Sequence, residues 1–397
     1  MAVAAPTEEL TPSAQLGWPK AAYLHIPFCR QRCHYCDFAT GLGTRELIET
    51  YVQRLCQEIG GTYRYRHLAG DPQPLTSIFF GGGTPSLLTV EQLGRILAQL
   101  RERIPFHPDC EISLEANPGT LTREQLAGYR DLGVNRISLG AQAFQAELLA
   151  ACGRLHGVEA IYEAVADLKA VGFENFNLDL IFGLPYQTLE HWQESLQAVL
   201  EINPAHVSVY DLTLEPETRF GRLYRPGEAP LPSEEATVEM YLMARRLLTQ
   251  AGYIHYEISN FARPGYACRH NRVYWENRPY FGFGMGSVGY EGGRRIHQPR
   301  TLHKYFEQVK AQVHPLPPPA SLEEIWMDTV MLGLRLQEGL DLATLQERFG
   351  SKRVKQALQR LDPYFEKGWA SCEGGRLRLV PPEGWLFSNE IIEELLF

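Results

Sequence analysis

Three cysteines on one short loop have the spacing of a metal-cofactor site. Cys29, Cys33 and Cys36 form the pattern C-x3-C-x2-C between Tyr23 and Phe38. Three thiolates placed in this way suit an iron–sulfur cube whose fourth iron has no protein ligand. An iron left open can bind a small molecule and take part in its chemistry. We therefore interpret the loop as the seat of a 4Fe–4S cluster.

Zinc and a disulfide are weaker interpretations of the same loop. Structural zinc usually takes four ligands from two separated pairs of cysteine or histidine, and a partner pair is missing here. A disulfide would leave one thiol over. We expect the scattered cysteines to be small buried apolar groups in a reducing compartment. These cysteines are Cys56, Cys110, Cys152, Cys268 and Cys372.

The composition is that of an ordinary soluble protein. The chain has 397 residues, with 44% hydrophobic and 21% charged side chains and a net charge of −9. This length allows two or three domains, and no apolar run is long enough to span a bilayer. The negative charge argues against nucleic acid as a main partner, because phosphate binding needs clustered lysine and arginine.

The first residues lack the features of an export signal. Residues 1–20 are rich in Ala, Pro and Thr, with two acids and no basic residue before Lys20. A signal peptide would need a basic start and an apolar stretch. We expect a disordered lead-in and a cytoplasmic location.

Between residues 21 and 232 the chain alternates β-rich runs with amphipathic helical patterns. The predicted strands are 21–26, 75–80, 111–114, 135–139, 175–181 and 205–212, and the predicted helices include 45–59, 90–104, 123–132, 158–170 and 189–202. This alternation is typical of βαβ units and a parallel sheet. Right-handed crossovers place every strand's carboxyl end at one mouth. The pattern predicts an α/β fold, a partial (β/α)6 barrel of the TIM type.

Polar and glycine residues follow the predicted strands at that mouth. The cysteine loop follows the first strand, and Gly81-Gly82-Gly83-Thr84-Pro85 follows the second. Glu115, Gln142 and Asp179 come at or after the next three. Glycines at a strand end permit close backbone approach to a ligand. Each residue alone could be a turn or cap, but their convergence on one mouth predicts a binding site.

The residue types predict a nucleoside-like zwitterion as the ligand. A glycine strip can hold the amino end of an amino acid, and Glu115 and Asp179 can accept from an amine or ribose hydroxyls. Arg154 can pair with a carboxylate through its planar fork. The glycine run lacks the Gly-Lys-Ser/Thr ending of a P-loop, which argues against a nucleoside triphosphate.

The second half of the chain predicts an extension and a separate small domain. Residues 233–314 begin with a helix over 233–250, followed by a candidate strand over 253–258, and 315–319 form a stiff proline-rich linker. Residues 320–397 contain three predicted helices, 321–336, 342–349 and 352–367, and a hairpin over 369–380. This order predicts a helical, winged-helix-like domain. DNA binding is the minority interpretation of it.

Several motifs together resemble a known enzyme superfamily. They are Tyr-x-His-Ile-Pro-Phe before Cys29, Gly-Gly-Gly-Thr-Pro (81–85), Ser-Leu-Glu-Ala-Asn-Pro (113–118), Gly-Ala-Gln-Ala-Phe (140–144) and Asn-Leu-Asp-Leu-Ile-Phe-Gly-Leu-Pro (177–185). In these motifs the chain resembles the radical S-adenosylmethionine (SAM) superfamily, in the branch of oxygen-independent coproporphyrinogen oxidases. The resemblance covers nearly the whole chain from about residue 21.

The resemblance implies the cofactors and the residues that bind them. It implies a 4Fe–4S cluster held by Cys29, Cys33 and Cys36, with SAM on the open iron. The matching positions for SAM are Tyr23, Gly82, Gly83, Thr84, Glu115, Gln142, Arg154 and Asp179, and Tyr35 completes the predicted cofactor-binding set. In such proteins the cluster and its ligand supply the one-electron chemistry, while the chain positions and shields them.

Two departures favour a heme-binding member of this branch. The oxidase proper carries a fourth cysteine two residues after the third, where this chain has Phe38. The string His270-Asn271-Arg-Val-Tyr274-Trp275 resembles the signature of the branch's heme chaperones. An imidazole can ligate heme iron and aromatic rings can pack on a porphyrin, so His270, Asn271, Tyr274 and Trp275 are the predicted heme residues. Cys268 is a rival iron ligand.

The predicted function is a heme chaperone that passes heme to an acceptor protein, a heme enzyme of the membrane. The first alternative is oxidative decarboxylation of coproporphyrinogen III, and the second is a cluster-bearing DNA-binding regulator. The resemblance also allows a homodimer and a peripheral position at the inner face of the membrane. Whether SAM is cleaved in the working cycle stays open.

Overall fold

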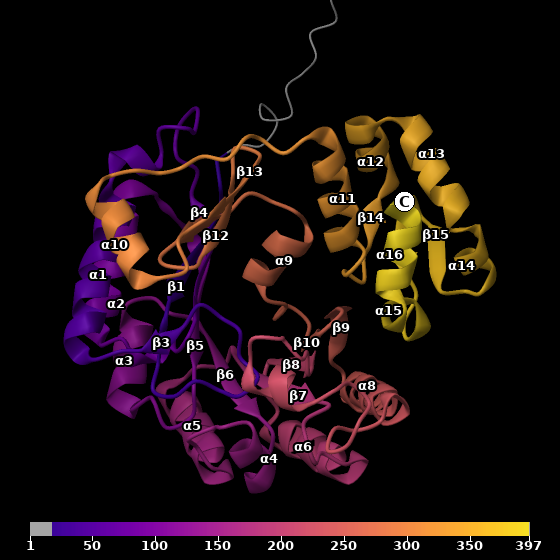
Figure 1. Cartoon of the computed structure of the whole chain (residues 1–397), viewed down its shortest axis with the longest axis horizontal. Helices are drawn as coiled ribbons and strands as arrows, with labels where there is room; N and C mark the ends of the chain where they lie inside the picture. Colours follow the sequence, from indigo (N-terminus) through magenta and orange to yellow (C-terminus); the bar gives the residue numbers. More distant parts are fainter. Residues whose placement is uncertain (1–17, 397) are drawn as a thin grey trace, which may run out of the picture.

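The computed structural model describes residues 18–396 (Figure 1). Most of the predicted lead-in therefore lies outside the described residues. Within the described part no helix is long and apolar enough to cross a membrane. The main body is a curved sheet wrapped by helices, and a small helical unit packs beside it (Figure 1).

Six parallel strands form the centre of a nine-stranded sheet in the order β11-β1-β4-β5-β6-β7-β8-β10-β9. The six are β1 (Ala21–Ile26), β4 (Leu75–Gly82), β5 (Phe106–Ala116), β6 (Arg136–Gln142), β7 (Phe176–Phe182) and β8 (His206–Asp211). Their order in the sheet follows their order in the chain, as repeated right-handed βαβ units require. The predicted partial (β/α)6 barrel is confirmed.

Helices on the outer face connect the strands. They are α1 (Arg45–Gly60), α2 (Val90–Arg103), α3 (Arg123–Asp131), α4 (Ala146–Ala151), α5 (Val158–Val171) and α6 (Leu189–Ile202), with the short turns η2 (Thr62–Arg64) and η3 (Pro85–Leu87). Threonine side chains cap the amino ends of several of them. At the start of α2 the Thr89 hydroxyl accepts from the backbone N–H of Gln92, and the Gln92 side chain accepts from the backbone N–H of Thr89. Their buried stripes and the strands build one large hydrophobic core.

The sheet is wider than the sequence pattern predicts. β11 (Phe281–Phe283) adds in parallel to β1, and β10 (Asn260–Ala262) adds antiparallel to β8 and pairs with β9 (Ile254–Glu257). The strand β9 lies within the predicted strand 253–258, whereas the three-residue strands β10 and β11 carry too little periodicity to be found in a sequence. The α8 helix (Glu234–Gln250) has the predicted N-cap, since Ser233 accepts from Ala236.

The rest of the extension encloses the end of the sheet beside β1. It comprises α9 (Arg269–Trp275), the hairpin β12 (Val288–Glu291) and β13 (Arg294–His297), and α10 (Leu302–Lys310), whereas α7 (Arg219–Leu223) precedes the extension and bonds the cysteine loop through Phe220 N and His34 O. Near the cysteine loop, β2 (Phe28–Cys29) pairs with β3 (Gly41–Leu42). Figure 1 shows α9 between the barrel and the C-terminal unit, and α10 beside α1.

A buried charged network joins this extension to the barrel. Arg64 donates to both carboxylate oxygens of Glu291, each at 2.7 Å, and its Nε lies 3.4 Å from Glu58 Oε1. Its Nη1 also lies 2.7 Å from Nε2 of His314, the first residue of the proline-rich stretch. Long-range bonds of this kind fix η2, β12 and the linker relative to one another.

The C-terminal unit has its own hydrophobic core. Its helices are α11 (Leu322–Gly333), α12 (Leu342–Phe349), α13 (Ser351–Arg360), α14 (Asp362–Glu366), α15 (Glu383–Leu386) and α16 (Ser388–Leu396), and its sheet is β14 (Leu340–Asp341), β16 (Arg376–Leu379) and β15 (Ala370–Glu373). The hairpin turns at Gly374 and Gly375, both with positive φ, as predicted. The predicted third helix is divided in two by Leu361, and Pro363 begins the second part.

Contacts with α9, β13 and β9 attach this unit to the barrel. Arg272 binds Glu338 through two hydrogen bonds of 2.9 and 3.0 Å, and Arg295 reaches Asp328 at 2.9 Å. Backbone bonds add Gln337 N to Tyr256 O. The helix that carries the H-N-x-x-Y-W string is thus held between two cores.

Candidate functional site

One cavity of about 600 Å³ at the barrel mouth brings most of the predicted residues together. Its lining includes Tyr23, Cys29, Cys33, Tyr35, Cys36, Gly82, Gly83, Glu115, Gln142, Arg154, Asp179, Asn271 and Tyr274. These residues come from five barrel strands, the cysteine loop, the turn after α4 and α9. The ends of the barrel strands therefore converge on one cavity, as predicted.

The cysteine loop is fixed at several points around its three thiols. Cys29 belongs to β2, and the Cys33 sulfur accepts a hydrogen bond of 3.3 Å from Arg154. Between the cysteines, the His34 ring is bonded to Ala151 O at 2.8 Å and does not line the cavity. All three thiols are half-buried and face the same cavity. Because the loop is fixed in this way, its three sulfurs are the groups that a cofactor in the cavity would meet.

Steric clashes exclude larger residues at Gly82 and Gly83 of the glycine strip. A Cβ on Gly82 would lie 2.5 Å from the His25 ring, and Gly82 has a φ of +113°. A Cβ on Gly83 would lie 2.6 Å from the backbone oxygen of Phe28. The strip therefore brings strand β4 directly against the start of the cysteine loop and leaves its backbone open to the cavity.

Polar groups on neighbouring strands face the same cavity. Gln142 has a φ of +71°, and its side-chain oxygen is buried without a hydrogen-bond partner. Burial and, after it, the charge of Asp179 raise the pKa of Glu115 to about 7. Burial also raises the pKa of Asp179, against hydrogen bonds from Ser208, Asn177 and Ser138. Buried polar groups without partners and strained backbone occur at binding sites, where a ligand can supply the missing hydrogen bonds.

Thr84 and Arg154 face a second, adjoining cavity of about 280 Å³ that also reaches Cys33. Arg154 is held by Asn117 Oδ1 at 2.5 Å and Gly140 O at 2.7 Å. The Thr84 hydroxyl accepts from Asn117 at 3.0 Å and does not line the main cavity. Thr84 thus lies behind the cysteine loop, among the groups that support it.

The H-N-x-x-Y-W string divides between two faces of α9. Asn271 and Tyr274 line the main cavity. His270 is fully buried, with Nδ1 3.0 Å from Ser77 Oγ and Nε2 2.9 Å from the Tyr274 hydroxyl. Trp275 lies on the face toward the C-terminal unit, under the guanidinium of Arg335. Neither imidazole nitrogen of His270 nor the Trp275 ring faces the cavity.

The rival ligand Cys268 is buried as well. Its sulfur lies 3.6 Å from Glu111 Oε1, and the other bonds of Glu111 come from the backbone of Arg269 and His270, each at 3.1 Å. A carboxylate from strand β5 therefore caps the amino end of α9. Glu111 was not among the predicted site residues, although it lies four residues before Glu115 on the same strand face.

Sequence reasoning also missed several groups inside the cavity. The lining includes Arg136, Ser138, Ser208, Tyr210 and Asp211, and at the mouth Arg32 and Phe38. On β6 the lining residues are Arg136, Ser138, Gly140 and Gln142, every second position of the strand. The period of two in a barrel strand was the signal that could have found them.

The residues present fit the cofactors that the motifs imply. Three thiols of one loop face the cavity, a carboxamide oxygen in it lacks a partner, and the glycine strip leaves no room for side chains. Cys29, Cys33 and Cys36 would hold the cluster, and the glycine strip, Glu115, Gln142 and Asp179 would hold SAM. When bound, this pair supplies one-electron reductive chemistry.

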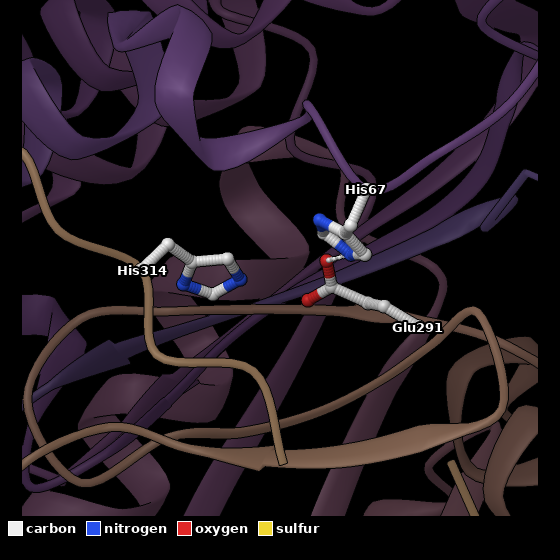
Figure 2. A group of neighbouring side chains, drawn as sticks. All are labelled: His67, Glu291 and His314. Atoms are coloured by element: carbon white, nitrogen blue, oxygen red, sulfur yellow. Dashed lines mark ion pairs between the residues drawn. The ribbon is translucent and has the colours of Figure 1, made fainter. Parts of the chain in front are cut away.

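A second group of potential metal ligands lies apart from this site (Figure 2). The ligand atoms of His67, Glu291 and His314 all lie within 4.8 Å of one another. Arg64 already binds both oxygens of Glu291 and the Nε2 of His314. The cation at this place is therefore a guanidinium, and the triad is a structural ion-pair network.

Comparison with known proteins agrees with the motifs. The family model described as "Radical SAM superfamily" matches residues 23–199, and the "HemN C-terminal domain" matches residues 320–387. The chain is 41% identical over 404 residues to "Heme chaperone HemW" of Synechocystis sp., covering 95% of this chain and 96% of that protein. "Heme chaperone HemW" of Bacillus subtilis is 38% identical over 381 residues, covering 95% and 99%.

Among solved structures, coproporphyrinogen III oxidase (HemN) of Escherichia coli superposes with a TM-score of 0.81 at 26% identity. The superposition covers 96% of this chain and 91% of that one. The fold, the order of the two units and the motifs thus agree over the full described length. The chain therefore belongs to the radical SAM superfamily and, within it, to the HemW family.

Proposed function

We propose that this protein is a heme chaperone that binds a 4Fe–4S cluster, SAM and heme, and passes heme to an acceptor protein. The observation that carries the proposal is that the cysteine loop and α9 line one cavity. A guest held against α9 would lie beside the cofactors of the cysteine loop. The HemW relatives and the H-N-x-x-Y-W string support heme as that guest.

The roles within α9 follow from its two faces. Asn271 and Tyr274 are the residues of the string that can touch a guest in the cavity. His270 acts as a positioning residue, because both its nitrogens are bonded and its ring stacks on Phe79 at 5.3 Å. Burial and then the charges of Arg136 and Arg278 lower the pKa of His270 to about 3, so the ring is neutral. Trp275 joins α9 to the C-terminal unit.

A heme titration tests this assignment. Anaerobically purified, cluster-loaded protein should bind heme by absorbance, and Tyr274→Ala and Asn271→Ala should weaken binding. His270→Ala should weaken it as well, with a change in the near-ultraviolet circular dichroism of the aromatic cluster that the other two do not cause. Unchanged heme binding in all three variants would remove α9 from the site.

The alternative activity is oxidative decarboxylation of coproporphyrinogen III, since the superposed HemN structure is such an oxidase. Phe38, at the position of the oxidase's additional cysteine, is 57% exposed at the cavity mouth and argues against it. Cluster-loaded protein, SAM, reductant and coproporphyrinogen III should give no protoporphyrinogen above background. Product formation at ordinary enzyme rates would overturn the chaperone proposal.

We also propose the acceptor to be a heme enzyme of the membrane, reached from the cytoplasm by peripheral contact, and a homodimer as the assembled form. Heme-loaded protein mixed with vesicles that carry an apo-form respiratory heme enzyme should lose its heme absorbance to the vesicle fraction. Light scattering of cluster-loaded and Cys29/Cys33/Cys36→Ala protein tests whether a dimer depends on the cluster. A heme that stays with the protein, or a monomer in both forms, would contradict these proposals.

A further inference from the structure

The floor of the main cavity contains a buried arginine without a partner. Arg136 is 2% exposed, and its Nε is buried with no hydrogen-bond partner. Its guanidinium makes no hydrogen bond or ion pair to any residue between 18 and 396. Buried arginines in folded proteins are paired almost without exception, because an unpaired buried charge costs several kcal/mol. Such a group needs an explanation.

Charged neighbours keep this guanidinium protonated without satisfying it. Burial alone would lower the pKa of Arg136, but the acidic groups of Cys268, Glu111 and Asp179 raise it above the usual value. Glu111 is engaged by the backbone of α9, and Asp179 by Asn177 and Ser138. The acids near Arg136 therefore have their hydrogen bonds elsewhere. The fork of Arg136 is left for a group that enters the cavity.

The position of Arg136 separates it from the arginine of the SAM site. Gln142 ends β6 at the mouth, and Arg136 begins the strand, about 20 Å away for six residues at ~3.3 Å each. Arg154 lies beside the cysteine loop, where it contacts the Cys33 sulfur. The cavity thus has one arginine at the cluster end and another at the opposite end, near the amino end of α9. Two arginines so far apart would contact different parts of whatever the cavity holds.

We propose that Arg136 is a carboxylate-binding residue for the guest held against α9, and that it takes a propionate of the heme. This inference rests on the proposed function. A planar guanidinium binds a carboxylate through two parallel hydrogen bonds. Ser138 and Ser208 line the same cavity, but their hydroxyls donate to Asp179 and Asn177, so the guanidinium is the free donor. The aromatic rings of Tyr23, Phe79 and Tyr274 offer flat apolar surface toward the same space.

The proposal assigns Arg136 a role in specificity. A tetrapyrrole with free propionates would pair with the guanidinium, whereas a neutral tetrapyrrole would leave it unpaired in the cavity. An unpaired buried polar group is what makes such sites reject analogues. We therefore expect the protein to discriminate heme from its dimethyl ester.

Titration of cluster-loaded protein with heme and with heme dimethyl ester tests the proposal. The wild type should bind heme more tightly than the diester. Arg136→Met should weaken heme binding roughly ten- to hundredfold, the usual loss for a charge-assisted pair, and leave diester binding unchanged. Arg136→Lys should retain part of the preference. Arg123→Met removes a surface arginine that pairs with Asp167 and should change neither affinity.

Each other outcome of this titration contradicts the proposal in a distinct way. Equal affinity of the wild type for both forms, or equal loss of both in Arg136→Met, gives Arg136 a structural role only. Loss of the preference in Arg32→Met instead places the carboxylate at the mouth. If Arg136→Met lowers SAM affinity while the heme preference persists, the carboxylate belongs to SAM. If the wild type binds neither tetrapyrrole, the proposed function fails together with this inference.

Discussion

Two arginines are buried among residues 18–396, and their surroundings differ. Arg64 is 0% exposed, both of its Nη atoms are hydrogen-bonded, to Glu291, His314 and the Gly282 carbonyl, and its Nε lies 3.4 Å from Glu58 Oε1. Arg136 is 2% exposed and has no hydrogen-bond partner among the described residues. The first is in a closed network at the edge of the sheet, and the second lines the open cavity.

The difference shows how a fold uses a buried charge. A saturated ion pair repays its desolvation cost through its own partners and fixes the elements that carry them. A buried charge without partners leaves its desolvation cost uncompensated until a ligand binds to it. The network of Arg64 joins η2, β12 and the proline-rich linker, whereas Arg136 has a free fork in a cavity with the cluster loop and α9. The same residue type is structural in one place and is available for binding in the other.

The largest effect should come from breaking the saturated pair. Arg64→Met leaves the Glu291 carboxylate fully buried without its cation. We expect urea unfolding to show a loss of about 3–5 kcal/mol in the free energy of unfolding, as for other broken buried pairs. Loss of less than about 1 kcal/mol would contradict the view that this network stabilises the junction between barrel and linker.

The next effect concerns the open cavity. Gly83→Ala would place a Cβ 2.6 Å from the Phe28 backbone oxygen, so the strip or the cysteine loop must move. We expect lower iron and sulfide content per chain and weaker SAM binding after anaerobic reconstitution. Gly41→Ala is the matched control, since nothing lies within 4 Å of its Cβ position. Equal cofactor content in the two variants would show that the strip does not seat the loop.

Acid titration should distinguish the two regions by the sign of its effect. Burial would raise the pKa of Glu291, but the Arg64 charge and hydrogen bonds from His67 and Arg64 hold it at about 2. Its stabilisation is therefore present above the unfolded pKa of about 4.3 and lost as the pH falls toward 2. Burial and Asp179 raise the pKa of Glu115 to about 7, so its contribution is lost as the pH rises through 7.

Urea unfolding of Glu115→Gln and Glu291→Gln checks these signs. Between about pH 5 and about pH 8, the wild type should lose stability relative to Glu115→Gln, because only the wild type must release this proton. The difference in stability between the wild type and Glu291→Gln should stay constant in this window, because Glu291 is ionised throughout and both proteins retain Glu115. Parallel pH profiles for wild type and Glu115→Gln would mean that Glu115 titrates normally in the folded protein.

The smallest effect should come from replacing the unpaired arginine. Arg136→Met removes a buried charge that has no hydrogen bonds to lose, although the attraction to Glu111 and Asp179 is lost with it. Exchange of poorly compensated buried charges for apolar groups is often neutral or stabilising. We expect the free energy of unfolding to change by about 1 kcal/mol or less. A loss comparable to that of Arg64→Met would mean that Arg136 is structurally paired.

Much of the barrel could be predicted from the sequence. The strands that begin at Ala21, Leu75 and Arg136 and the helix Leu189–Ile202 lie within one or two residues of the predicted ranges at their starts. Long periodic segments bury one face each, so their pattern is written in the chain. The strand β9 lies within the predicted strand 253–258, but β10 and β11 were missed because their residues pair only once the edges of the sheet exist. The final helices, α15 and α16, were not among the predicted elements.

The sequence by itself determined the cofactor loop and the motifs, because their residues are neighbours along the chain and their spacing is local chemistry. Only the tertiary structure decided which side chains face the cavity. The turn of α9 buries His270 and places Trp275 under Arg335 of the C-terminal unit, while Asn271 and Tyr274 line the site. Whether an arginine finds a carboxylate depends on contacts between residues more than 200 positions apart, as for Arg64 and Glu291. Such pairing is a property of packing and leaves no local pattern.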